Sequence, residues 1–336
     1  MKTATIALLF TLVSNSIAVA EELPPWLNVH GEINFDVLGS SQSNFEQNLR
    51  VQDAELKFEI LVREGIKLVV KAEIEEQLKG TPFAHKWNVG SLLQEAYIEI
   101  ETDKISGLPK ALIKFGKHQV AFGQDFTEIP MSDDTLLADL LTKDEVVGLT
   151  VELPASFFQI VDKVAFSIFE SVPGDLIISN KKGFSFQLSK EITSQLSAEI
   201  SGLIQAQEES PLVEKRGSIG FVFQSQSGQW KVWSEGIITV DNSALQGSNL
   251  GAQVGGSANV GPGAIVLQYE FLQKNAHEIA VAYNLPIGSY LVLSPEIRYR
   301  KDLGPEMQDE TVIGIRARIE AEKSIRHNLL KGSKKK

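Results

Sequence analysis

Residues 118–145 carry the densest group of acidic side chains in the sequence. The segment, HQVAFGQDFTEIPMSDDTLLADLLTKDE, holds seven carboxylates against one lysine. Such a group can ligate a metal ion, form a solvated linker, or set the ionic preference of a pore, since rings of Asp and Glu select cations. The carboxylates that we single out are Asp125, Glu128, Asp133, Asp134 and Asp139.

Basic side chains recur at the spacing of a strand face near the end of the chain. Arg298 and Arg300 stand two residues apart, and so do Arg316 and Arg318. Side chains at i and i+2 of a strand point to the same face. If these strands line a channel, the arginines form a basic patch. The candidate patch comprises Arg298, Arg300, Arg316, Arg318, Lys57 and Lys71.

Histidines and serines give no catalytic or metal-binding pattern. The five histidines are His30, His85, His118, His277 and His327. No two of them stand at i, i+2, and no Gly-x-Ser-x-Gly elbow occurs. A nucleophile would need a positioned base beside it. We interpret the histidines as solvated surface side chains and expect no enzyme, no metal site and no cofactor.

The first twenty residues have the features of a secretory signal peptide. Lys2 supplies the positive charge, an apolar run extends from Ala4 to Val13, and Ala18-Val19-Ala20 matches a small-x-small cleavage pattern. A buried N-terminal helix is the alternative. We predict export, with residues 1–20 removed.

Composition limits the class of partner. The chain has no cysteine, so neither a disulfide framework nor a thiolate metal site is expected. The net charge of −11 argues against a nucleic acid, which would need a basic face. Beyond the signal there is no run of about 18 apolar residues, so we expect no transmembrane helix.

The rest of the chain alternates between apolar and polar residues. In 27–38, LNVHGEINFDVL, apolar Leu27, Val29, Ile33 and Phe35 share one face and polar residues occupy the other, as in a strand that separates two environments. Sixteen such segments lie near 27–38, 50–63, 66–77, 93–101, 111–118, 145–153, 160–169, 182–191, 195–204, 216–225, 229–240, 249–258, 263–271, 276–285, 289–300 and 311–321.

The connections between these segments tend to alternate between long and short, as in a transmembrane barrel with short turns on one side and long loops on the other. A soluble β-sandwich or a β-solenoid would also alternate, but we find neither a domain break nor a fixed repeat. Closing the sheet pairs every backbone group and removes the edges. We predict an all-β fold: a single transmembrane antiparallel up-and-down β-barrel of about 16 strands over 21–321, with 322–336 as a basic tail.

The acidic segment is the third long connection of this barrel, at 119–144. Pro130 and Ser132 resemble a helix start, with acidic residues favourable in the first turn. Leu136 and Leu140 would share one face of this helix, and so would Leu137 and Leu141. We predict a short helix folded into the lumen, with leucines on the wall and carboxylates toward water.

Sixteen strands with a long acidic third loop resemble the bacterial outer-membrane porins. More narrowly, the segment GKHQVAFGQDFTEIPMSDDTLLADLL is similar to one in porin-like proteins assigned to siderophore uptake. The matching positions are Gly116, Lys117, Phe122, Gly123, Ser132, Asp133, Thr135 and Leu136. The resemblance implies a diffusion or uptake channel whose third loop forms the constriction. Porins typically end on an aromatic residue, whereas this chain continues through SIRHNLLKGSKKK.

We therefore expect an outer-membrane channel for small polar solutes or ions, with ferric siderophore as one candidate solute. The expected partners are outer-membrane lipid and these solutes, and we consider a homotrimer as the assembly. The alternative function is a non-conducting barrel that acts in adhesion or receptor binding through its loops.

Overall fold

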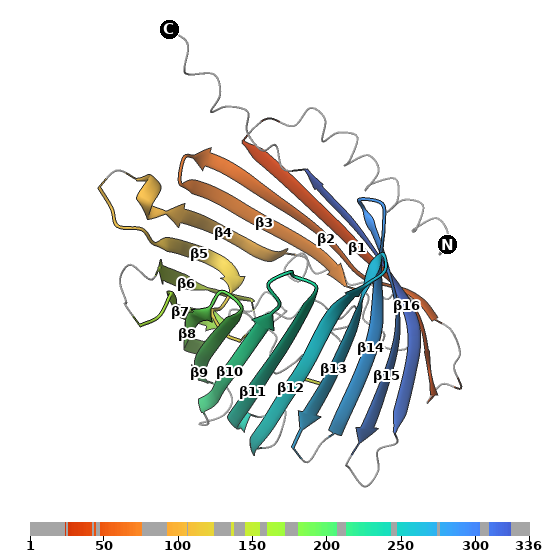
Figure 1. The fold of residues 1–336 in the computed structure, drawn as a ribbon. Helices are drawn as coiled ribbons and strands as arrows, with labels where there is room; N and C mark the ends of the chain where they lie inside the picture. Colours follow the sequence, from red (N-terminus) through yellow and green to blue (C-terminus); the bar gives the residue numbers. More distant parts are fainter. Residues whose placement is uncertain are drawn as a thin grey trace.

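The protein is a closed barrel of sixteen antiparallel strands (Figure 1). The computed structural model describes residues 24, 26–41, 44, 48–75, 93–105, 107–123, 136–137, 145–154, 160–171, 181–206, 213–242, 247–273, 276–302 and 309–323. The strands are β1 (Leu27–Ser40), β2 (Asn48–Arg63), β3 (Ile66–Glu75), β4 (Leu93–Glu101), β5 (Leu112–Gln119), β6 (Glu145–Pro154), β7 (Lys163–Ser171), β8 (Lys181–Thr193), β9 (Leu196–Ala206), β10 (Val213–Gln224), β11 (Trp230–Asn242), β12 (Gly247–Val260), β13 (Gly263–Leu272), β14 (Ala276–Ile287), β15 (Leu291–Asp302) and β16 (Glu310–Lys323).

Each strand pairs with the strands before and after it in the chain, and β1 closes the barrel against β16. The closing register runs from Val29 opposite Lys323 to Ser40 opposite Val312. The predicted up-and-down barrel of about 16 strands is confirmed, and each predicted strand boundary falls within three residues of the observed one. A closed sheet has no edge, so its backbone groups find partners around the whole ring.

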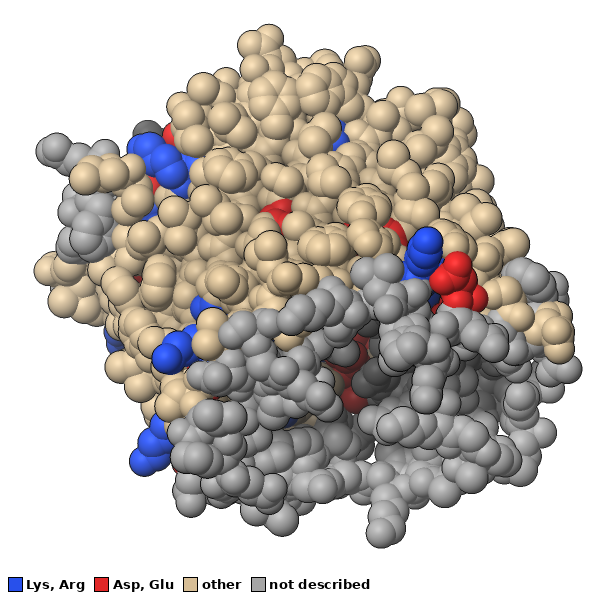
Figure 2. Space-filling view, turned by 90° about the horizontal axis from the view of Figure 1, so that it is seen from below, with Lys and Arg blue, Asp and Glu red and all other residues tan. Residues whose placement is uncertain are grey.

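The strands turn their apolar side chains outward and their polar side chains inward. On β16, Ile313 and Ile315 are 50% and 52% exposed, whereas Arg316 is 5% exposed. The tan outer face in the upper part of Figure 2 accordingly carries few charged side chains. Exposed apolar surface costs about 25 cal/mol per Å² in water. An outer face of this kind therefore suits hydrocarbon, while the polar inner face suits water.

The two ends of the barrel differ in their connections. At the turn end, β2 and β3 are separated only by Glu64 and Gly65. The 102–110 connection at the same end is longer and contains a 3₁₀ turn, η3 (Thr102–Lys104), whose approach is fixed by a hydrogen bond from Glu101 N–H to Gly65 O (2.8 Å). The opposite, loop end carries the third connection, between β5 and β6.

Several sequence predictions fall on residues outside the described ranges. These are the signal peptide at 1–20, the tail beyond Lys323, and the third connection apart from 120–123 and 136–137. Leu136 and Leu137 form a turn, so the predicted short helix is not confirmed. Strand β16 ends two residues beyond the predicted limit of 321. Among the described residues, no helix is long and apolar enough to cross a bilayer.

Candidate functional site

The inner face of the barrel has two chemically different parts. We call the first the charged wall; it runs from β14 through the β16–β1 closure to β4 and is lined by Glu278, Arg298, Arg300, Arg316, Asp36, Glu55, Lys57 and Lys71. We call the second the anchor wall; it runs from β6 to β13 and is lined by Thr150, Ser167, Gln187, Ser201, Leu203, Ile237, Gly251 and Glu270.

The four predicted arginines do lie together, on the inward faces of the neighbouring strands β15 and β16. They are not an isolated basic patch, because carboxylates lie among them. The Arg316 guanidinium binds both oxygens of Asp36, at 2.8 and 3.5 Å. Arg300 donates to Glu278 at 2.7 Å, and Arg298 lies 3.8 Å from the other oxygen of Glu278. The two carboxylates therefore offset part of the positive charge of the four arginines.

The two predicted lysines continue this wall on the next strands. Lys57 of β2 and Lys71 of β3 are direct cross-strand neighbours. Lys71 contacts Glu55 at 2.8 Å and Glu73 at 3.3 Å, and Lys57 contacts Glu59 at 3.3 Å. Like charges placed opposite each other on a sheet are unfavourable unless compensated. The carboxylates supply that compensation and make this a mixed-charge ladder.

The third connection turns into the lumen directly after β5. Its first residues bond to three successive strands of the anchor wall. Ala121 N–H donates to Ser167 Oγ on β7 (3.1 Å), and Gly123 N–H donates to Ser201 Oγ on β9 (2.9 Å). Between them, Gln187 of β8 donates its amide to Gly123 O (3.0 Å). Small hydroxyl and amide side chains thus fix the path of the connection.

Apolar contacts hold the same connection against the anchor wall. Phe122 is 1% exposed and Leu137 is fully buried. They belong to one cluster with Val120, Val146, Phe169, Leu203, Ile237 and Leu272, against which Leu136 also packs. The prediction that leucines of this segment lie on the wall is confirmed for Leu136 and Leu137.

Glycine makes room for Leu137 on the wall. A Cβ at Gly251 would lie 2.9 Å from both Leu137 Cδ2 and Ile237 Cγ2, too close for two carbons. The Leu137 N–H is also satisfied, since it donates to Glu270 Oε2 at 2.8 Å. Leu137 is therefore held by close packing over Gly251 and by a charge-assisted hydrogen bond, which is stronger than a hydrogen bond between neutral groups.

The interpretation of His118 as a solvated side chain is wrong. It is 1% exposed and lies inside the barrel at the end of β5. Its Nε2 lies 2.6 Å from Thr150 Oγ1, which lies 2.8 Å from Ser167 Oγ, and its Nδ1 lies 2.9 Å from Gly116 O. Ser167 also accepts the N–H of Ala121, so this chain of hydrogen bonds supports the start of the third connection.

The positions that carried the narrower resemblance have distinct structural roles. Gly116 has φ of +130°, and a Cβ there would lie 2.3 Å from Ala96 O, so only glycine fits. Lys117 faces outward and donates to Leu93 O at 2.5 Å. Phe122 and Gly123 are the anchors described above. Ser132 and Thr135 lie outside the described residues.

The predicted acidic constriction cannot be placed. Asp125, Glu128, Asp133, Asp134 and Asp139 all lie outside the described residues. Within the described part of the chain, no group of three His, Asp or Glu side chains is arranged to hold a metal ion.

Sequence reasoning missed the neutral residues of the anchor wall. Thr150, Ser167, Gln187 and Ser201 are each 8% exposed or less. A signal existed, because these polar residues alternate along β6–β9 with apolar residues that face outward.

Known structures with the same architecture are outer-membrane proteins. The outer membrane channel DcaP of Acinetobacter baumannii matches with a TM-score of 0.61 and 12% identity over 88% of this chain and 97% of its own. A triple mutant of the Rhodopseudomonas blastica porin matches with a TM-score of 0.53 and 10% identity, over 88% and 99%. The chain shares the barrel architecture of these proteins.

OmpT of Vibrio cholerae, in vitro folded and in its trimer form, matches with a TM-score of 0.55 and 10% identity, over 88% and 99%. No protein-family model and no curated protein sequence matches this chain. At these identities the porin likeness establishes the architecture and leaves the solute to be argued from the residues.

Proposed function

We propose that the protein forms a water-filled channel in an outer membrane and conducts small polar solutes or ions by passive diffusion. The observation that carries this proposal is the inverted barrel: sixteen strands with apolar residues outside and paired charges inside. A barrel of this size is too wide for its own side chains to fill. A polar wall that is not filled by side chains holds water.

The third connection is the proposed constriction. Two described pieces of it, 120–123 and 136–137, are bonded to the inner wall on β7–β9 and β13. The five predicted carboxylates belong to the sequence between and just after these pieces. Acidic side chains that narrow a pore attract cations and repel anions, and we propose that role for them.

Planar-bilayer recording tests the channel directly. The purified protein should produce discrete, ohmic conductance steps, with larger steps at higher salt because the pore is aqueous. If the folded protein inserts without any steps, the channel proposal fails and a role in adhesion or receptor binding through the loops takes its place.

The acidic constriction has its own test. Neutralising Asp125, Asp133 and Asp134 together to Asn should move the reversal potential in a KCl gradient toward anion permeation. The matched control is Asp103→Asn, since Asp103 is exposed in the η3 turn at the opposite end. An unchanged reversal potential in the triple variant would reject the acidic filter while leaving the channel in place.

Narrower proposals concern the solute and the assembly. Ferric siderophore follows only from the third-connection resemblance, and uptake into proteoliposomes should be measured beside a small sugar as a reference solute. A homotrimer is the proposed assembly, in line with the trimer form of Vibrio cholerae OmpT. Analytical ultracentrifugation in detergent at matched density measures it. We propose no catalytic role.

A further inference from the structure

Charged side chains of alternating sign cross six successive strands on the inner face, in the half of the barrel near the turn end. Each of the strands β2–β7 contributes one of them, and the signs run negative, positive, negative, positive, negative, positive. The row extends past β4, where the charged wall ends. We call it the charge belt; its residues, in strand order, are Glu59, Lys67, Glu99, Lys114, Glu152 and Lys163.

Contacts between neighbouring strands link the first four members of the belt. The Lys67 ammonium lies 3.7 Å from a carboxylate oxygen of Glu59 and 2.8 Å from one of Glu99. Glu99 and Lys114 are direct cross-strand partners. The Cβ atoms of such partners are about 4.5–5.5 Å apart, close enough for their side chains to interact. Lys67 and Glu99 therefore each have a charge of the opposite sign on both sides.

Glu152 continues the alternation by joining the last two lysines. One of its oxygens lies 3.2 Å from the Lys114 ammonium and the other lies 2.7 Å from the Lys163 ammonium. The six side chains of the belt are between 9% and 43% exposed, so water reaches each of them. An ammonium group has three donors and a carboxylate has about four acceptor positions. Groups that already form an ion pair can therefore bind a second partner from the lumen.

The alternation of sign favours solutes that carry both charges. An anion beside Lys67 is attracted by this lysine but repelled by Glu59 and Glu99 on either side of it. A cation beside Glu152 is likewise repelled by the lysines on both sides. A solute with an ammonium group at one end and a carboxylate at the other can place each end beside a charge of the opposite sign. Neighbouring strands are about 4.8 Å apart, which sets the best separation of the two ends.

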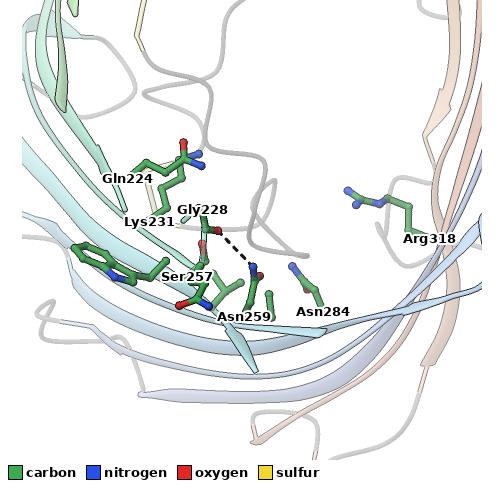
Figure 3. A pocket seen from close by; sticks show the side chains of 11 residues that line it. Gln224, Gly228, Lys231, Ser257, Asn259, Asn284 and Arg318 are labelled. Atoms are coloured by element: carbon green, nitrogen blue, oxygen red, sulfur yellow. Dashed lines mark hydrogen bonds between the residues drawn. The ribbon is translucent and has the colours of Figure 1, made fainter. Parts of the chain in front are cut away.

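The inner face on the other side of the barrel has no such alternation. A hollow on β10–β14 is lined there by amide and hydroxyl side chains (Figure 3). Its charged residues, Lys231 and Arg318, are both basic, and no acid occurs among the described residues that line it. In the half of the barrel near the turn end, this face therefore lacks the succession of signs that β2–β7 provide. The labelled polar residues of the hollow are Gln224, Ser257, Asn259 and Asn284.

We propose that the charge belt binds dipolar solutes that carry one ammonium and one carboxylate group, and that it favours them over simple ions of either sign. The glutamates of the belt receive the ammonium end and the lysines receive the carboxylate end. The proposal rests on the channel proposed above, because solutes reach the belt through the lumen. It names amino acids whose two charged groups are about one strand spacing apart as the solute class.

The experiment measures the excess noise that a binding solute adds to the open-channel current at low salt. The probe is 4-aminobutyrate, whose extended chain spans about one strand spacing. Butyrate, butylammonium and 1-butanol have the same chain with one charge or none. Only 4-aminobutyrate should add saturable noise, and the noise should fall in 1 M KCl, where the Debye length is about 3 Å. Equal noise from butyrate or butylammonium, or noise that 1 M KCl leaves unchanged, would overturn the proposal.

A charge swap tests the alternation without changing the net charge. The double variant Lys67→Glu with Glu99→Lys places two acids side by side on β2 and β3 and two bases side by side on β4 and β5. It should raise the half-saturating concentration of 4-aminobutyrate about threefold, the factor expected for exposed ion-pair contacts. The matched control swaps an exposed pair outside the belt, Asp162→Lys with Lys190→Asp (3.1 Å). Equal half-saturating concentrations in the two swaps would overturn the proposal.

A single neutralisation provides a second, independent variant. Glu152→Gln removes the acid between Lys114 and Lys163, so two bases follow one another without a negative charge between them. This variant should bind 4-aminobutyrate more weakly and should gain saturable noise from butyrate. Heat-modified gel mobility checks that each variant keeps its barrel. Noise from butyrate that stays at the wild-type level in the folded variant would contradict the role of Glu152.

Binding to the protein in a non-ionic detergent separates the belt from the channel. Carbon NMR line broadening of isotope-labelled 4-aminobutyrate reports binding without any current. Broadening that is lost in the Lys67→Glu with Glu99→Lys variant, in a protein that does not conduct, would support the belt and overturn the channel. Conductance without excess noise or broadening from 4-aminobutyrate would overturn the belt and leave the channel standing.

Discussion

The charged wall and the anchor wall have the same strand geometry, but their inward side chains bind different partners. On the charged wall, the basic side chains of Arg298, Arg300, Arg316, Lys57 and Lys71 contact carboxylates from their own or a neighbouring strand. On the anchor wall, short neutral side chains leave space that the third connection occupies, as Ser201 does for Gly123. The side chains of the charged wall contact one another, whereas those of the anchor wall bind the third connection.

The difference shows how a wide barrel can have a polar lumen and still hold a connection inside it. Long charged side chains hold water and stay in the wall plane through ion pairs. Short Ser, Thr and Gly side chains cannot fill the lumen, but they allow a loop backbone to approach closely and bond to the wall. The described pieces of the third connection therefore lie where short side chains of the wall leave room for them.

The largest effect is expected where a buried charge on the charged wall loses its partner. Asp36 is fully buried and holds the Arg316 guanidinium, which is 5% exposed. Asp36→Asn removes the carboxylate that binds this buried cation and should lower the free energy of unfolding by about 3–5 kcal/mol. Urea unfolding in lipid vesicles, followed by tryptophan fluorescence, measures the change.

The double variant Asp36→Leu with Arg316→Met is the control for this prediction. It removes both charges and should be close to neutral, since buried pairs can be replaced by apolar residues without loss. If the single and double variants have the same free energy of unfolding, burial of the pair is not what stabilises the closure between β1 and β16.

The next effect is expected on the anchor wall. Phe122→Ala removes a ring that is 1% exposed and should cost about 3 kcal/mol of docking free energy for the third connection, within the range for buried phenylalanine. The barrel should remain folded, while the open-channel current becomes noisier and larger. The matched control is Phe166→Ala, whose ring faces outward at 39% exposure. Equal noise in the two variants would contradict the anchoring role.

A smaller effect is expected on ion selectivity. Glu278 contacts both Arg298 and Arg300, so Glu278→Gln adds one net positive charge to the charged wall. For an ion roughly 8 Å away in water this amounts to about 0.5 kcal/mol, a factor of about two in partitioning. The reversal potential should shift toward anions.

The control for selectivity is Glu64→Gln. It removes the same charge from the exposed turn between β2 and β3. A shift of the same size in both variants would mean that selectivity responds to net charge alone and not to the charged wall.

Much of the fold follows from alternation along the sequence. A period of two assigns each side chain to the inner or outer face, so the common face of Arg298, Arg300, Arg316 and Arg318 was predictable. The carboxylates that contact these arginines were not predictable. Asp36 and Arg316 meet because β1 pairs with β16, and that register depends on the closure of the whole ring.

The anchor wall shows a second limit of the sequence. The apolar content of the third connection predicted contact with the wall, but not which strands would receive it. The interpretation of His118 as solvated is wrong because a lone histidine in a sequence is typical of the surface. Its alternation with Lys114 and Gly116 nevertheless places it on the inner face beneath the start of the third connection. Inward position and proximity to a connection must be considered together.

The smallest effect sharpens the contrast between buried and exposed ion pairs. Asp162, just before β7, accepts the Glu191 N–H (2.5 Å) and the Lys190 ammonium (3.1 Å). The Glu191 N–H first, and Lys190 next, hold the pKa of the Asp162 carboxyl below its ordinary value of 3.8. A lowered folded-state pKa gives stability that is present above the unfolded-state pKa and is lost as pH falls through the folded-state value. The difference in the free energy of unfolding between wild type and Asp162→Asn should therefore be small at pH 7 and vanish on acidification below pH 3.8. Because exposed pairs contribute little, a pH 7 difference as large as that of Asp36→Asn would show that burial does not separate the two pairs.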